Sequence, residues 1–174
     1  RKRLDEVSRE YVERIIDRSR RRLGVDSLDL VQFHWWDYSV DNYVETAQYL
    51  AELQEEGKID HIGVTNFDVE HLEEIMDAGV PVISNQVQYS LLDHRPESGM
   101  ADFCAERDVS LLCYGTLAGG FLTERYLGEP DPGPATDLDN RSLTKYRLII
   151  RDTGGWDTYQ NLLETVADIA DKHG

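Results

Sequence analysis

The chain has 174 residues, of which 40% are hydrophobic and 30% charged, so it is long enough for a buried core and has the composition of a soluble globular protein. Its formal net charge of −16 indicates an acidic surface and argues against a nucleic-acid partner, because phosphates would be repelled. No apolar run approaches the ~20 residues of a membrane span and no signal peptide is recognisable, so we expect no membrane partner.

Helix and strand patterns alternate through the first two thirds of the chain. In order, the pattern predicts a helix after Ser8 that ends at about Leu23, a strand over 28–35, a helix over 40–56, a strand over 59–64, a helix after Asp68 that stops at Gly79, a strand over 82–89, a helix over 100–107 and a strand over 110–114. Strands that alternate with helices of this length indicate βαβ units, and therefore an α/β fold with a parallel sheet.

The pattern is less regular after Gly119 and Gly120. Residues 128–141 contain three prolines, two glycines and four acidic residues, which predicts a surface loop. Apolar residues at helical spacing return over 143–150 and over 156–173, so two further helices are expected.

The chain contains two cysteines, Cys104 and Cys113, both in apolar segments and without the spacing of metal ligands. We interpret them as buried free thiols, which fits a reducing compartment. The sequence therefore predicts a cytoplasmic location.

Hydrogen-bonding side chains stand where four successive predicted strands end. They are His34 on the first strand, Thr65 and Asn66 after the second, Asn85, Gln86 and Gln88 on the third, and Tyr114 with Gly115 and Thr116 after the fourth. In a parallel barrel these ends meet at one mouth, where catalytic and ligand groups gather. Each residue also has a structural interpretation: packing for His34 and Tyr114, a turn for Asn66, and bridging of neighbouring backbone for the glutamines.

Four segments, in correct order and spacing, resemble motifs of the aldo-keto reductase family. RRLGVDSLDLVQFHWW resembles the segment with the family's histidine, and EEGKIDHIGVTNFDVEHLEE is similar to its EEGKIRHIGVSNF signature. VISNQVQYSLLD resembles its NQVEYS strand, and CYGTLAGGFLT its YSPLxxGxLT strand and loop. The resemblance covers about residues 8–126 and, more weakly, the 156–174 helix. It implies a partial (β/α)8 TIM barrel, about strands 4–7 with their helices, in which 1–174 is a single incomplete domain.

This resemblance implies an NAD(P)H-dependent reductase of a small-molecule aldehyde or ketone, with NADP as the cofactor and NAD as the alternative. His34 falls on the residue that orients and polarises the substrate carbonyl. Thr65, Asn66 and Gln86 fall on the residues that hold the nicotinamide carboxamide, whose donors and acceptors such a trio can satisfy. Tyr114 falls on the aromatic residue that stacks on the nicotinamide ring.

Two further groups of residues follow from the resemblance. Gly115, Thr116 and Leu117 match the loop beside the cofactor pyrophosphate, and Thr116 stands where proline is usual, which changes the loop's expected stiffness and keeps its backbone donors. Trp35 and Trp36 follow the histidine directly. At least one of them is expected to line the substrate pocket, with packing at the barrel rim as the alternative.

The resemblance also implies that the chain is an internal fragment of a longer enzyme. The family's proton-donating tyrosine, with its supporting lysine and aspartate, belongs to earlier strands, and the basic residues for the adenosine phosphate are expected beyond Gly174. Substrate specificity in this architecture lies in loops, several of which this sequence does not include. The substrate itself is therefore not predicted, and neither is the oligomeric state.

Three alternatives stay open. The chain could come from a non-catalytic relative that binds the nucleotide as a redox sensor or as an accessory subunit of a channel. It could also be an inactive, truncated remnant. Another barrel enzyme, such as a metal-dependent one, is disfavoured because no carboxylate or second histidine stands at these strand ends, so no metal site is predicted.

Overall fold

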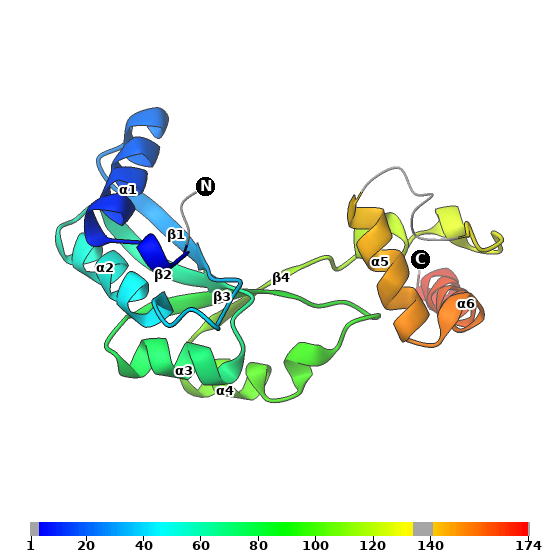
Figure 1. Cartoon of the computed structure of the whole chain (residues 1–174). Coiled ribbons are helices and arrows are strands. Elements are labelled where there is room, and N and C mark those ends of the chain that lie inside the picture. The colour runs from blue at the N-terminus through cyan, green and yellow to red at the C-terminus, as the bar shows by residue number, and fades with distance from the viewer. Residues whose placement is uncertain (1–3, 134–140, 174) are drawn as a thin grey trace. The chain divides into compact units, whose positions relative to one another are not determined.

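Strands and helices alternate along the chain as far as β4 in the computed structural model, which describes residues 4–133 and 141–173 (Figure 1). In chain order the elements are α1 (Arg9–Leu23), β1 (Leu28–His34), α2 (Tyr43–Glu55), β2 (Ile59–Thr65), α3 (Val69–Asp77), β3 (Val82–Gln88), α4 (Met100–Glu106), β4 (Ser110–Tyr114), α5 (Arg141–Asp152) and α6 (Gly155–His173). Short 3-10 helices cover Leu4–Glu6, Arg95–Glu97, Ala118–Gly120 and Glu124–Tyr126. Every predicted strand and α-helix is present.

The predicted helix starts are confirmed by capping hydrogen bonds. The Ser8 hydroxyl accepts from the backbone N–H of Tyr11 at 3.4 Å, and the Asp68 carboxylate accepts from that of His71 at 3.0 Å. Gly24 ends α1 in the left-handed conformation, with φ of 70°, and its N–H donates to the Arg20 carbonyl. These local signals fix where the helices begin and end, and therefore where the intervening strands lie.

The four strands form one sheet in the order β1-β2-β3-β4. β1 pairs with β2 in parallel, and β2 pairs with β3 in parallel. The second pair contains a register shift between Ile62 and Gly63. Parallel neighbours require a crossover connection, which α2 and α3 supply here. The predicted α/β order and the predicted parallel pairing are confirmed for these strands.

The chain divides into two compact units, residues 1–87 with 96–112 and residues 88–95 with 113–174. In the first unit, α1 and α2 lie side by side, and α2 packs against β2 (Figure 1). Its core includes Leu53, Ile62 and Leu72, all fully buried. The single incomplete domain predicted over 1–174 stays a prediction.

The second unit has its own core beneath α5 and α6. The Tyr159 hydroxyl donates to the Phe121 carbonyl, and the Trp156 indole N–H donates to the Glu129 carbonyl at 2.9 Å. Gln160 bonds two further backbone groups of the same segment. Helix α6 therefore holds the 121–129 segment through side chains that also fill the core.

Two sequence predictions differ in part from the structure. Residues 128–133 have no helix or strand, as predicted, whereas 134–140 of the predicted loop lie outside the described residues and Arg141 already belongs to α5. Cys104 is buried, but Cys113 is exposed, so its predicted burial is wrong. Cys113 lies on β4, the last strand in the sheet order, where no further strand of the described chain covers it.

No helix within residues 4–133 and 141–173 combines the length and the apolarity that crossing a bilayer requires.

The first unit's core gives a direct stability test. We expect Leu72→Ala to lower the free energy of unfolding by about 2–5 kcal/mol, because it removes a fully buried side chain and leaves a cavity. Leu23→Ala is the matched control: Leu23 is 69% exposed, and its truncation should change that free energy by no more than about 0.5 kcal/mol. Chemical denaturation measures both, and similar losses in the two variants would contradict the burial described for α3.

Candidate functional site at the strand ends

Three of the predicted site residues form one row across the first unit's sheet. The parallel register pairs His34 at the end of β1 with Thr65 at the end of β2, and Thr65 with Gln86 on β3. Neighbouring strands lie ~4.8 Å apart, so these three positions are adjacent along the hydrogen-bonding direction. The structure thus brings together residues that are 52 positions apart in the sequence, from His34 to Gln86.

A second polar row lies one step deeper on the same face, because residues two apart on a strand share a face. Here Gln32, Gly63 and Ser84 are paired across the three strands, and the Gln32 amide donates to the Ser84 hydroxyl at 3.4 Å. A Cβ added at Gly63 would overlap Ser84 Oγ and lie 2.6 Å from Gln32 Oε1. Glycine is therefore required for the side chains on either side to meet. Sequence reasoning missed this row, although the two-residue period of each strand was the signal for it.

The turn after β2 is fixed by backbone and amide contacts. Asn66 adopts a left-handed conformation with φ of 58°, which asparagine tolerates better than most residues, and its N–H donates to the Gln86 carbonyl at 2.9 Å. Asn85 is fully buried, and its side-chain amide donates to the Phe67 carbonyl at 3.0 Å. Asn85, which the sequence places at a predicted strand end, therefore holds this turn.

The exposed fraction of each side chain shows which of the strand-end residues a ligand could reach. His34 and Asn66 are exposed, whereas Thr65 and Gln86 are half-buried. No side-chain hydrogen bond within the described residues uses the Thr65 hydroxyl or the Gln86 amide, so both are available to a ligand. The row presents hydroxyl and amide groups together, which is the donor set that suits a planar amide.

The two tryptophans after β1 differ in their surroundings. Trp35 is 3% exposed, and its indole N–H donates to the carbonyls of Asp37 and Val40 at 2.9 and 3.2 Å, which favours the packing alternative for this residue. Trp36 is 56% exposed, and its ring centroid lies 6.3 Å from that of His34. Trp36 is therefore the tryptophan with surface available to a ligand.

The remaining predicted residues belong to the second unit and form a tight turn after β4. Tyr114 is half-buried, and its carbonyl accepts from the Tyr89 N–H at 3.1 Å. Gly115 has φ of 73°, and a Cβ there would overlap the Tyr146 hydroxyl. Thr116 and Leu117 are exposed. Tyr146 therefore packs against the turn at Gly115, and the side chains of Thr116 and Leu117 are exposed to solvent.

A buried carboxylate lies in the same unit. Asp93 accepts from Arg95 Nε at 2.8 Å and Nη2 at 2.6 Å, and from the Gln88 amide at 2.7 Å. Its hydrogen bonds from the Arg95 guanidinium hold the pKa of Asp93 below its ordinary value. This interaction accounts for Gln88, one of the glutamines noted at the strand ends.

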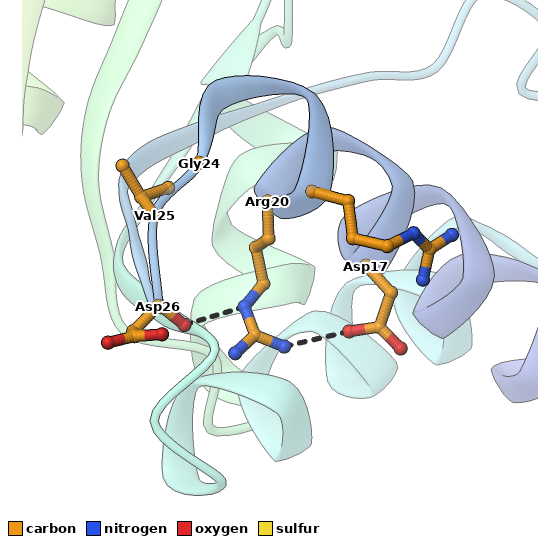
Figure 2. A pocket seen from close by; sticks show the side chains of 6 residues that line it. Asp17, Arg20, Gly24, Val25 and Asp26 are labelled. Carbon is orange, nitrogen blue, oxygen red and sulfur yellow. Dashed lines mark hydrogen bonds and ion pairs between the residues drawn. The ribbon is translucent and has the colours of Figure 1, made fainter.

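A surface pocket of about 380 Å³ lies elsewhere, at the C-terminal end of α1 (Figure 2). Arg20 crosses it and donates to the Asp26 carbonyl at 2.6 Å and to the Asp17 carboxylate at 2.8 Å. This pocket precedes β1 and so lies at the opposite end of that strand from His34. Residues with metal-binding character do not cluster anywhere in the described ranges.

Comparison with known proteins points to the same family as the four sequence motifs. A model of the aldo/keto reductase family matches residues 2–174. Among curated proteins, flagellar radial spoke protein 5 of Chlamydomonas reinhardtii is 32% identical over 166 residues, which are 86% of this chain and 31% of that protein.

Two solved structures extend this agreement to the fold. The holo form of an aldo-keto reductase from Bacillus halodurans has a TM-score of 0.62 and 31% identity, over 73% of this chain and 42% of that one. A Gox0644 mutant in complex with NADPH has a TM-score of 0.60 and 33% identity, over 68% of this chain and 44% of that one. The chain thus spans less than half of each protein compared, and its strands and helices are those of a partial (β/α)8 barrel.

The support for the β2 turn is testable by one substitution. We expect Asn85→Ala to lower the free energy of unfolding by about 1–3 kcal/mol, because the Phe67 carbonyl loses its buried donor. Asn161→Ala, at an exposed position of α6, is the control and should leave stability within about 0.5 kcal/mol of the wild type. Denaturant titration measures both free energies, and a loss in Asn85→Ala no larger than that in Asn161→Ala would contradict the support role.

Proposed function

Because the chain belongs to the aldo/keto reductase family, we propose that the longer protein carrying it reduces an aldehyde or ketone to an alcohol, with NADPH as the hydride donor and NADH as the alternative. A family member of similar sequence was solved with NADPH, which supports the choice of cofactor. The chain spans only 31% to 44% of the relatives compared, so the proposal concerns a protein in which further strands complete the barrel.

The row of His34, Thr65 and Gln86 is the observation that carries this proposal. The proposal assigns the nicotinamide carboxamide to the Thr65 hydroxyl and to the Asn66 and Gln86 amides. A carboxamide has one acceptor and two donors, and this set can satisfy all of them without a charged group. Asn66 directly follows Thr65 in the sequence, and its backbone N–H donates to the Gln86 carbonyl at 2.9 Å, which supports grouping the three residues.

Tyr114 is assigned to stacking on the nicotinamide ring, and the turn after it to binding the pyrophosphate. A ring stacked on the nicotinamide leaves one face of the cofactor for the substrate without needing charge. The exposed turn residues Thr116 and Leu117, with Gly115, are assigned to the pyrophosphate, where backbone N–H groups are suitable donors.

His34 is assigned to the reacting carbonyl. When bound, the reduced nicotinamide supplies the hydride, and the carbonyl oxygen gains negative charge as the hydride arrives. A fixed hydrogen-bond donor at that oxygen stabilises the developing charge. His34 is exposed at the end of β1, with Trp36 beside it as the substrate contact. Protonation of the oxygen is assigned to the tyrosine that the family carries on an earlier strand.

A non-catalytic relative that only binds the nucleotide would have the same carboxamide site. The two functions are separated by turnover: oxidation of NADPH that depends on an added carbonyl compound supports the reductase, and binding without such turnover supports the sensor or accessory-subunit alternative.

The cofactor assignment predicts a pattern of losses in NADPH affinity of the full-length protein. Gln86→Ala and Asn66→Gly should each weaken binding about three- to tenfold through lost hydrogen bonds; glycine is chosen at 66 because it keeps the left-handed backbone. Tyr114→Ala should weaken binding about tenfold or more through lost stacking. Gln48→Ala, on the exposed surface of α2, is the control. Fluorescence titration gives the affinities, and unchanged binding in all three site variants would reject the assignment.

A further inference from the structure

A lysine of the second unit packs against the tyrosine assigned to the nicotinamide. The Lys145 ammonium, on α5, lies 4.8 Å from the centroid of the Tyr114 ring and 5.0 Å from that of the Tyr146 ring. Both distances are within the range of a cation–π interaction. Lys145 is 31 positions from Tyr114 in the sequence, and none of the sequence motifs includes it.

The position of α5 against this turn is set by close packing. Tyr146 is buried, and its ring fills the space that a side chain at Gly115 or Gly119 would need; a Cβ at Gly119 would lie 2.7 Å from Tyr146 Cδ2. The glycines therefore allow the helix to approach the turn closely. Because Lys145 precedes Tyr146 on the same helix, this contact also places its ammonium beside Tyr114.

The charge of Lys145 is not neutralised by a neighbour. Within residues 4–133 and 141–173, no carboxylate forms an ion pair with its ammonium, and the nearby Asp93 is already paired with Arg95. Partial burial, with Arg95 as the next cause, lowers the pKa of Lys145 from its ordinary value. Stacking of the Tyr114 ring on another ring does not itself require a positive charge, so the Lys145 ammonium beside it calls for a separate explanation.

We propose that Lys145 is a specificity-determining residue of the cofactor site, which favours the reduced nicotinamide over the oxidised one. The inference rests on the proposed function, because it takes Tyr114 as the stacking partner. The oxidised ring carries a positive charge and the reduced ring carries none. A cation held against Tyr114 therefore repels the oxidised ring, whichever face of the tyrosine the nicotinamide occupies.

Attraction between Lys145 and the phosphates of the cofactor would not mask its repulsion of the oxidised nicotinamide ring. NADPH and NADP+ carry the same phosphate groups, so any attraction of Lys145 to them strengthens both complexes equally. The ratio of the two dissociation constants, Kd for NADP+ divided by Kd for NADPH, isolates the charge on the ring. A preference of this kind would keep the product form of the cofactor from occupying the site.

The test measures both dissociation constants in the full-length protein for the wild type and for Lys145→Met, which removes the charge and keeps most of the side chain. We expect the ratio to fall about three- to tenfold, the size of an interaction between charges several ångströms apart near the surface. Lys145→Arg keeps the charge and should preserve the ratio. Lys172→Met removes one positive charge from the exposed end of α6 and should also preserve it.

Each of the following results would overturn the inference. An unchanged ratio in Lys145→Met, with NADPH still bound, would leave the proposed function standing and remove the role of Lys145. If the ratio is unchanged because both complexes are weakened equally, the lysine acts on the phosphates alone. Failure of the wild-type protein to bind NADPH would instead reject the proposed function, and the inference with it. Lys145→Gln provides the same comparison if the methionine variant does not fold.

Discussion

The parallel register of β1, β2 and β3 is the constraint on which the rest of the site depends. It pairs His34 with Thr65 and Thr65 with Gln86, so that residues from three separate segments stand side by side. A shift of one residue in any of these pairs would turn a whole strand over and send its polar side chains to the helix-covered face. The caps at Ser8 and Asp68 fix where α1 and α3 begin, and side chains of the helices and strands share the buried core of the first unit.

Glycines and a buried amide fix the positions of the side chains around the candidate site. Gly63 lets Gln32 and Ser84 approach across β2, and Asn85 holds the turn that carries Asn66. In the second unit, Gly115 makes room for the ring of Tyr146. The exposed and half-buried side chains at the strand ends are thus supported by buried residues, and such support keeps a group of uncharged hydrogen-bonding side chains in one geometry.

Much of this could be predicted from the sequence because the signals are local. Caps, glycine stops and the alternation of strands with helices gave the elements, and polar residues at the strand ends gave His34, Thr65 and Gln86 as neighbours. The two-residue period of each strand indicates that Gln32, Gly63 and Ser84 share a face with the strand-end residues, but the pairing of Gly63 with Ser84 follows a register shift between Ile62 and Gly63, which no local pattern encodes. The contact of Lys145 with Tyr114 depends on how α5 packs against the turn after β4, and the exposure of Cys113 depends on its position in the sheet order.

The most direct test of the central claim is an experimental structure of the full-length protein with NADP+. We expect the carboxamide to lie within hydrogen-bonding distance of the side chains of Thr65, Asn66 and Gln86, and the nicotinamide ring to stack on Tyr114. A cofactor bound with its nicotinamide away from these strand ends, for example at the pocket beside Arg20, would contradict it.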